Sequence, residues 1–254
     1  WDELNAAAEK LQAAGVIPFA HGGQAWQDAT VFEAVAMGIG GNNYYKNCYV
    51  DLKETCLRSE TTVKVFDQMR KLQGFTDEGS PGRDWNVATG MVIEGKAGFQ
   101  IMGDWAKGEF TAAGKVPGVD YYCAPTPSNN GYLYNVDSFI FYKTSDPEKQ
   151  EGQKLLAKLM MGKNFQKVFN LYKGSIPARL DVSMDEFDKC AKTSNSDIKT
   201  AGASGGLVPS FAHGMAQGNT MKAALQDVIT EHFNSDMSSV DAANALADSV
   251  LDNL

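Results

Sequence analysis

The stretch that decides the fold is Phe99–Trp105, which reads FQIMGDW. The residues before it, 92–98, read as a helix end, a glycine turn and the beginning of an apolar strand. The pattern predicts a strand over 98–102 with Trp105 at its carboxyl end, where open α/β sheets place their ligand crevices. An indole ring beside polar groups suits a sugar, because one face of a pyranose is mostly C–H while its hydroxyls need hydrogen-bond partners. The alternative is a buried tryptophan at a strand end.

Helices and short strands alternate along the rest of the chain. Apolar residues at helical spacing predict the helices, and short apolar runs that end at turn residues predict the strands. The predicted helices cover 2–14, 27–39, 60–73, 86–94, 104–113, 146–161, 163–170, 218–233 and 238–252, and the predicted strands cover 16–20, 98–102, 121–123 and 136–142. Asp2 and Asp84 are predicted as helix N-caps. We therefore expect an α/β fold with a mixed sheet rather than a barrel, because too few strands alternate with helices.

The composition narrows the class of protein. The chain has 254 residues, which is enough for one large domain or two smaller ones, and it is 43% hydrophobic and 21% charged, as globular proteins are. Its net charge of -8 disfavours nucleic acid and anionic membranes as partners. No apolar run approaches the ~20 residues that a membrane helix needs, so direct membrane insertion is not expected.

The sequence favours a binding protein over an enzyme. Phosphate-loop and zinc motifs are absent, and no cofactor or metal is implied. Asp104 and Glu109 are a conceivable glycosidase pair, but they lie five residues apart on one predicted helix and would not face each other across a cleft. Asp84 and Asp137 would meet only if the fold brought them together. A glycoside hydrolase therefore stays the less favoured alternative.

The four cysteines, Cys48, Cys56, Cys123 and Cys190, carry information about the compartment. They form no Cys-x-x-Cys motif, which weakens zinc and thioredoxin-like interpretations. An even number suits two disulfides in an oxidising compartment, in which Cys48 and Cys56 would close a short loop and Cys123 would pair with Cys190. Four reduced thiols in a cytosolic protein are the alternative.

Five short motifs resemble the extracytoplasmic solute-binding proteins of sugar ABC importers, in the group of the maltose-binding protein. The motifs are WDE at 1–3, MGDW at 102–105, NVDSF at 135–139, KGSIP at 173–177 and AHGM at 212–215. They stand in the family's order over essentially the whole chain, and no single one of them is specific. Together with HGGQ at 21–24 they look like the bacterial glucose-binding branch.

The resemblance implies a type II periplasmic binding protein fold, in which two lobes close by a hinge around a ligand. It also implies that this chain lacks the family's amino-terminal stretch. Residues 1–135 and 176–254 would then form the two parts of the carboxy-terminal lobe, and 136–175 would be an excursion into an incomplete amino-terminal lobe. Apolar side chains of that excursion would be left partly uncovered, namely Phe139, Phe141, Leu155, Leu159, Phe165 and Phe169.

The resemblance also implies site residues. Trp105 would be the stacking platform, Asp137 would accept hydrogen bonds from sugar hydroxyls, and Lys173 would donate one. His213 would contact the sugar, and Trp26 and Gln24 would line the far side of the pocket. The alternatives are structural: a hinge carboxylate for Asp137, a solvated lysine at a helix end for Lys173, and a core histidine for His213.

The resemblance therefore implies a periplasmic protein that captures a monosaccharide, with glucose the first choice, and delivers it to the membrane permease of an ABC importer. It needs no cofactor and binds no nucleic acid. The oxidising periplasm implies the disulfides Cys123–Cys190 and Cys48–Cys56. A protein for another sugar or an oligosaccharide is the alternative within the same class.

Overall fold

The computed structural model describes residues 1–128 and 131–254, which divide into two compact units. Unit 1 comprises Trp1–Gly103, Ala124–Asn135 and Asp197–Leu254, and unit 2 comprises Asp104–Cys123 and Val136–Ser196. Of the two boundaries expected from the sequence, 135/136 is also a boundary of the units, whereas 175/176 lies inside unit 2. Each unit therefore brings together segments that lie far apart in the sequence.

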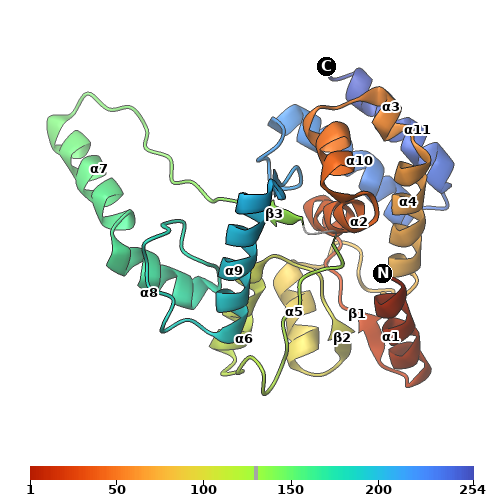
Figure 1. The fold of residues 1–254 in the computed structure, drawn as a ribbon, viewed down its shortest axis with the longest axis horizontal. Coiled ribbons are helices and arrows are strands. Elements are labelled where there is room, and N and C mark those ends of the chain that lie inside the picture. The colour runs from red at the N-terminus through yellow and green to blue at the C-terminus, as the bar shows by residue number, and fades with distance from the viewer. Residues whose placement is uncertain (129–130) are drawn as a thin grey trace. The chain divides into compact units, whose positions relative to one another are not determined.

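Helices form most of unit 1, as Figure 1 shows. They are α1 (Asp2–Ala13), α2 (Ala25–Tyr45), the π-helical turn η1 (Lys46–Val50), α3 (Glu54–Leu57), α4 (Glu60–Gln73), α5 (Trp85–Ile93), α10 (Asn219–Asn234) and α11 (Ser239–Leu251), and α9 (Lys189–Ser204) begins in unit 2 and ends in unit 1. The predicted helix over 60–73 is correct to the residue. The helix predicted at 2–14 deviates by one residue at its end, and those predicted at 86–94, 218–233 and 238–252 deviate by one residue at both ends. Helix α9 was not predicted, because its polar sequence carries no continuous apolar stripe.

The central element of the unit 1 core is α2, which packs against α4 and α10, while α11 packs against the same two helices. Phe32 is fully buried, with its ring centroid 5.0 Å from that of Phe66 on α4 and 6.2 Å from that of Phe211. Burying a phenylalanine stabilises the fold by about 1.5–3 kcal/mol. Gly41 interrupts α2 with φ +73° and ψ -178°, a conformation that is essentially restricted to glycine and that costs other residues roughly 1–3 kcal/mol. The predicted end at residue 39 lies just before this break.

The strands of unit 1 are short and pair in parallel. Strand β1 (Ile17–Phe19) pairs with β2 (Ala97–Phe99), and β3 (Tyr132–Tyr134) pairs with β4 (Leu207–Pro209). The expectation of one mixed sheet is wrong for the described residues, because these strands form two separate parallel pairs. The predicted strand at 98–102 is shorter and begins one residue earlier, and β3 and β4 were not predicted.

Two predicted strands are absent from the structure. Residues 136–142 have no regular secondary structure, and 121–123 contribute only an isolated bridge between Tyr121 and Pro117. Both runs are apolar enough to form strands. A strand also needs a neighbour that satisfies its backbone groups, and among the described residues none lies beside 136–142 in a ladder.

The predicted N-caps are corrected by the structure. The N-cap of α1 is Trp1, and Asp2 lies in the first turn, where its charge complements the positive end of the helix dipole. Asp84 does occupy the N-cap position of α5, but its side chain makes no capping hydrogen bond. Its Oδ1 instead accepts a hydrogen bond of 2.6 Å from Gln24 Nε2. Asp84 therefore connects α5 to the loop before α2.

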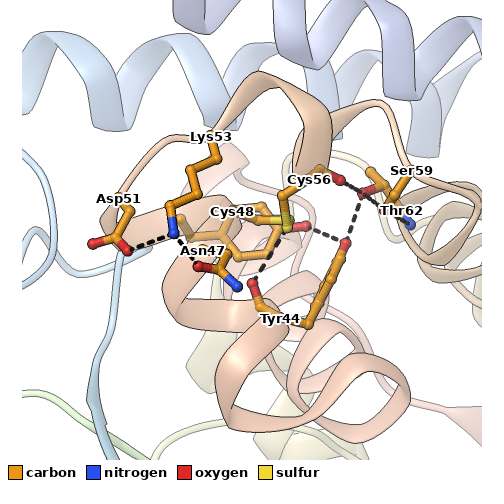
Figure 2. The surroundings of a disulfide bond; sticks show 9 residues. Tyr44, Asn47, Cys48, Asp51, Lys53, Cys56, Ser59 and Thr62 are labelled. Atoms are coloured by element: carbon orange, nitrogen blue, oxygen red, sulfur yellow. Dashed lines mark hydrogen bonds and ion pairs between the residues drawn. A yellow bond between two sulfur atoms is a disulfide. The ribbon is translucent and has the colours of Figure 1, made fainter.

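The disulfide Cys48–Cys56 joins η1 to the short helix α3 in unit 1, with 5.2 Å between the two Cα atoms. Figure 2 shows the bond beside Tyr44, whose hydroxyl lies 2.8 Å from Thr62 Oγ1. The Thr62 hydroxyl in turn donates to the carbonyl of Cys56. The loop that the disulfide closes is therefore also tied to α4.

The disulfide Cys123–Cys190 joins the two chain segments of unit 2, with 5.7 Å between its Cα atoms. Both expected disulfides are thus confirmed, and the alternative of four reduced thiols is wrong. The predicted single helix over 104–113 is the 3-10 turn η2 (Asp104–Ala106) followed by α6 (Lys107–Ala112). The predicted helices at 146–161 and 163–170 are α7 (Pro147–Met160) and α8 (Lys163–Lys173).

Unit 2 has a small interior. Phe110 and Tyr121 stack with their ring centroids 4.1 Å apart, and the buried Lys107 pairs with Asp188 at 2.6 Å. Large apolar side chains remain exposed on the irregular segment and on α7 and α8, among them Phe139, Phe141, Leu155, Leu159 and Phe169. Five of the six side chains expected to be uncovered are therefore exposed, and Phe165 is half-buried.

Within 1–128 and 131–254, no helix has the length and apolar character needed to span a membrane.

Candidate functional site

Three of the candidate residues, Gln24, Trp26 and His213, lie together in unit 1. Trp26 is in the first turn of α2, and its Nε1 donates to Gln24 Oε1 at 2.8 Å. The indole and the imidazole of His213 lie edge to face, with centroids 6.0 Å apart and planes inclined by 67°. All three side chains are half-buried. The group thus combines an aromatic ring with amide and imidazole groups that can bind hydroxyls.

The close approach of two loops at Gly23 explains how the side chain of Gln24 comes within hydrogen-bond distance of Asp84. A Cβ on Gly23 would collide with the backbone of Ser80 and Pro81, so only glycine permits this approach of the two loops. Two backbone hydrogen bonds, from Gly23 N to Arg83 O and from Gly82 N to Gly23 O, hold the contact. The carboxylate of Asp84 is exposed beside Gln24. Sequence reasoning treated Asp84 as a helix cap and did not connect it to this group.

The other three candidates, Trp105, Asp137 and Lys173, belong to unit 2. The expectation that Trp105 ends a strand is wrong: β2 ends at Phe99, and Trp105 lies half-buried in the turn η2. Lys173 is the last residue of α8 and forms an ion pair with Asp137. Its Nζ also lies 5.8 Å from the ring centroid of Phe169. Because the Asp137 side chain is 61% exposed, this pair contributes little to stability.

Asp104 connects the turn of Trp105 to the loop after Lys173. Burial raises the pKa of the Asp104 carboxyl above its ordinary value, and hydrogen bonds from Ser175 and the Ile176 N–H and the charges of nearby lysines oppose this shift. Gly174 adopts φ +91°, and a Cβ there would lie 2.7 Å from Gly108 N. The end of α8 and the beginning of α6 therefore touch backbone to backbone. Neither the sequence pattern nor the resemblance singled out Asp104 as this link.

The geometry suits recognition more than catalysis. Asp104 and Glu109, the conceivable hydrolase pair, lie on the consecutive elements η2 and α6. The sequence GASGG at 202–206 matches the Gly-x-Ser-x-Gly pattern, but its serine ends α9 and precedes β4, the reverse of the strand–turn–helix order of a nucleophile elbow. Among the described residues, no group of three or more His, Cys, Asp or Glu side chains is arranged to hold a metal ion.

Residues 1–160 match the family model described as bacterial extracellular solute-binding protein. A relative from Brucella suis named "Probable sugar-binding periplasmic protein" is 46% identical over 98% of this chain and 59% of its own length. A relative of the same name from Rhizobium meliloti is 43% identical over 98% of this chain and 60% of its own length. The chain thus spans about 59% of the length of these relatives.

Solved structures show the same fold. A chitin oligosaccharide binding protein superposes with a TM-score of 0.77 at 16% identity, covering 99% of this chain and 64% of that protein. The predicted class, α/β of the type II periplasmic binding proteins, is confirmed. The family consists of binding proteins found outside the cytoplasm, in agreement with the predictions of a non-enzyme and a periplasmic location. This chain belongs to the bacterial extracellular solute-binding protein family.

Proposed function

We propose that the whole protein captures a monosaccharide, with glucose as the first choice, and delivers it to the membrane permease of an ABC importer. The observation that carries the proposal is that each unit holds a half-buried tryptophan and polar side chains that can bind hydroxyls: Gln24 and His213 contact Trp26 in unit 1, and unit 2 contains Trp105 and the Asp137–Lys173 ion pair. The names of the relatives support a sugar as the ligand class.

Each candidate residue has a proposed role. Trp105 stacks against a C–H face of the sugar, Asp137 accepts hydrogen bonds from adjacent hydroxyls, and Lys173 donates one. The Asp137–Lys173 ion pair supports this assignment, because it presents an acceptor and a donor side by side. Trp26, Gln24 and His213 provide a second set of contacts.

The proposal includes the lobe assignment made from the sequence, with 136–175 as an excursion from a lobe formed by 1–135 and 176–254. Sugar binding would then favour the closed state of the two-lobed protein, and the permease would recognise that state. No step in this cycle needs a cofactor or a chemical change of the ligand.

Calorimetry of the whole protein with a panel of hexoses, pentoses and oligosaccharides tests the proposal. We expect one monosaccharide, glucose first, to bind with clear saturation and to be recovered unchanged after incubation. Binding of oligosaccharides alone would support the alternative ligand class. Cleavage of a glycoside would contradict the binding function, and the absence of binding to every sugar would reject the ligand class.

A further inference from the structure

The amide of Gln24 links the indole of Trp26 to the carboxylate of Asp84. Its Oε1 accepts from Trp26 Nε1 at 2.8 Å and from Gln27 Nε2 at 3.1 Å. Its Nε2 donates to Asp84 Oδ1 at 2.6 Å. An indole N–H can only donate and a carboxylate can only accept, so these two neighbours leave one orientation for the amide between them. The chemistry of its partners therefore determines which end of Gln24 faces which side chain.

These contacts decide which atoms of the group remain for a ligand. An indole has a single N–H, and Gln24 accepts it, so Trp26 is left with the surface of its ring. Gln27 is fully buried, and its Nε2 also donates to a backbone carbonyl. The Asp84 side chain is exposed, and Gln24 is its only hydrogen-bond partner among the residues that the structure describes. Asp84 is thus the accessible acceptor beside the ring of Trp26.

The backbone that carries Asp84 is held by the residue before it. Arg83 donates through both Nη atoms to the carboxylate of Asp77, and its Nη1 also donates to the carbonyl of His21 at 3.3 Å. The carbonyl of Arg83 accepts the Gly23 N–H at 3.1 Å. The position of Asp84 is therefore fixed before a ligand arrives, which lowers the entropic cost of binding.

Asp84 also gives up a local contact. It occupies the N-cap position of α5, where an aspartate ordinarily accepts a backbone N–H of the first helical turn. Its side chain makes no such bond and turns to Gln24 instead. A departure of this kind from local preference is typical of a functional site.

We propose that Asp84 is a further ligand-binding residue, which accepts a hydrogen bond from a sugar hydroxyl, and that Gln24 is the positioning residue that holds it. The site then selects a ligand in which a hydroxyl borders a C–H face, because the ring of Trp26 packs against the face and the carboxylate binds the hydroxyl. The inference rests on the proposed function, since it takes the ligand to be a sugar that contacts Trp26.

The substitution Asp84→Asn tests the contact by calorimetry of the whole protein. It removes the charge, and its amide oxygen can still accept from Gln24. We expect glucose to bind about tenfold more weakly, because hydrogen bonds to charged groups are the stronger ones. The matched control is Glu94→Gln, which removes an exposed carboxylate at the other end of α5 and should leave the affinity unchanged. Unchanged affinity in Asp84→Asn, or an equal loss in the control, would overturn the contact.

Monodeoxy analogues of glucose separate a contact from a structural effect. A contact couples Asp84 to a particular hydroxyl, so the wild type and Asp84→Asn should bind the analogue that lacks this hydroxyl equally well. The other analogues should keep the tenfold difference. If Asp84→Asn weakens glucose and every analogue by the same factor, its effect is structural and the proposal is wrong.

The substitution Gln24→Ala tests the positioning role. If Gln24 acts through Asp84, the substitution should weaken glucose binding less in the Asp84→Asn background than in the wild type. NMR of the indole N–H, identified with Trp26→Phe, gives a readout without sugar: its exchange with solvent should be faster in Gln24→Ala. If this variant does not fold, Gln24→Met replaces it. Equal losses in both backgrounds, or an unchanged exchange rate, would reject the role of Gln24.

The wild type separates this inference from the proposed function. If it binds a sugar other than glucose, that sugar and its monodeoxy analogues take the place of the glucose series. If it binds no sugar, the proposed function and the Asp84 contact fail together, and the indole exchange rate still decides the role of Gln24. If it binds sugar and Asp84→Asn binds equally well, only the inference fails.

Discussion

Unit 1 and unit 2 belong to one chain, yet only unit 1 encloses a large apolar core among the described residues. Most of the buried apolar side chains of unit 1 form one continuous cluster, in which α2, α4, α10 and α11 are the main elements. The buried apolar residues of unit 2 are Phe110, Phe187 and Ala191. Unit 2 instead relies on a disulfide, the Lys107–Asp188 pair and the contact of α6 with the end of α8. An amphipathic helix thus contributes to a core only where other helices pack against its apolar face.

The difference in packing should be visible in single substitutions. We expect Phe32→Ala in unit 1 to cost about 3–5 kcal/mol, because it leaves a cavity in a close-packed core. The matched control is Phe169→Ala in unit 2, where the ring is partly exposed and the loss should stay well below that. Urea unfolding of both variants measures the difference. Equal losses would mean that α8 is covered as well as α2.

The two disulfides should contribute unequally. Cys123–Cys190 spans 67 positions and Cys48–Cys56 spans 8, and a longer loop restricts the unfolded chain more. Removing the first by a double change to serine should cost about 2–4 kcal/mol and should loosen unit 2, and removing the second should cost less. Denaturation monitored by hydrogen exchange separates the two units. A larger loss at Cys48–Cys56 would reverse the comparison.

A buried histidine should make unit 1 sensitive to acid. Burial lowers the pKa of His232 to about 4, the charge of Arg70 adds to this, and neither ring nitrogen has a hydrogen-bond partner among the described residues. The unfolded state, with an ordinary pKa near 6.5, therefore binds a proton before the folded state does. Stability is fully present above about pH 6.5 and falls by up to about 3 kcal/mol towards pH 4.

The variant His232→Gln tests this pH dependence. It should flatten the loss of stability between about pH 6.5 and 4 relative to the wild type. Urea unfolding at a series of pH values gives the comparison. An unchanged slope in the variant would assign the acid sensitivity to other groups.

The proposed role of Trp105 as a stacking platform provides the sharpest test of the part that unit 2 takes in sugar binding. Trp105→Ala should remove measurable sugar binding from the whole protein, a loss of about 2 kcal/mol or more, as expected for an aromatic anchor. Trp85→Ala, on α5 of unit 1, is a control for the loss of an indole outside the proposed contacts. Calorimetry of both variants measures the effect. Unchanged affinity in Trp105→Ala would remove this residue from the site.

The Asp137–Lys173 ion pair of unit 2 should have the smallest effect. Asp137→Ala and Lys173→Ala should each weaken binding about tenfold, at the lower end for charged hydrogen bonds, because solvent screens the Asp137 carboxylate of the pair. Neither change should alter the melting temperature appreciably. If either variant binds the sugar as tightly as the wild type, that residue has only a structural role.

Much of the fold was predictable where the interactions are local. The apolar spacing of 60–73 predicted α4, and the structure agrees to the residue, with Ser59 as an N-cap that accepts a hydrogen bond from Thr62 N. The apolar run 136–142 failed as a strand prediction, because a ladder depends on a partner that lies elsewhere in the sequence. The same limitation hid β3 and β4, which lie more than seventy residues apart and pair with each other.

The sequence by itself determined most of the helices and, through its ordered motifs, the family together with the two disulfides that the family implies. Helix signals repeat within a turn or two and can be read along the chain. Only the tertiary structure showed that Asp84 contacts Gln24 and that Trp105 lies in η2 and not at a strand end. It also showed that Ser210 contacts both Glu33 and His213. The physical reason is that a buried or half-buried polar group is satisfied by whichever partner the fold brings near. That partner can be more than 170 residues away, as Ser210 is from Glu33.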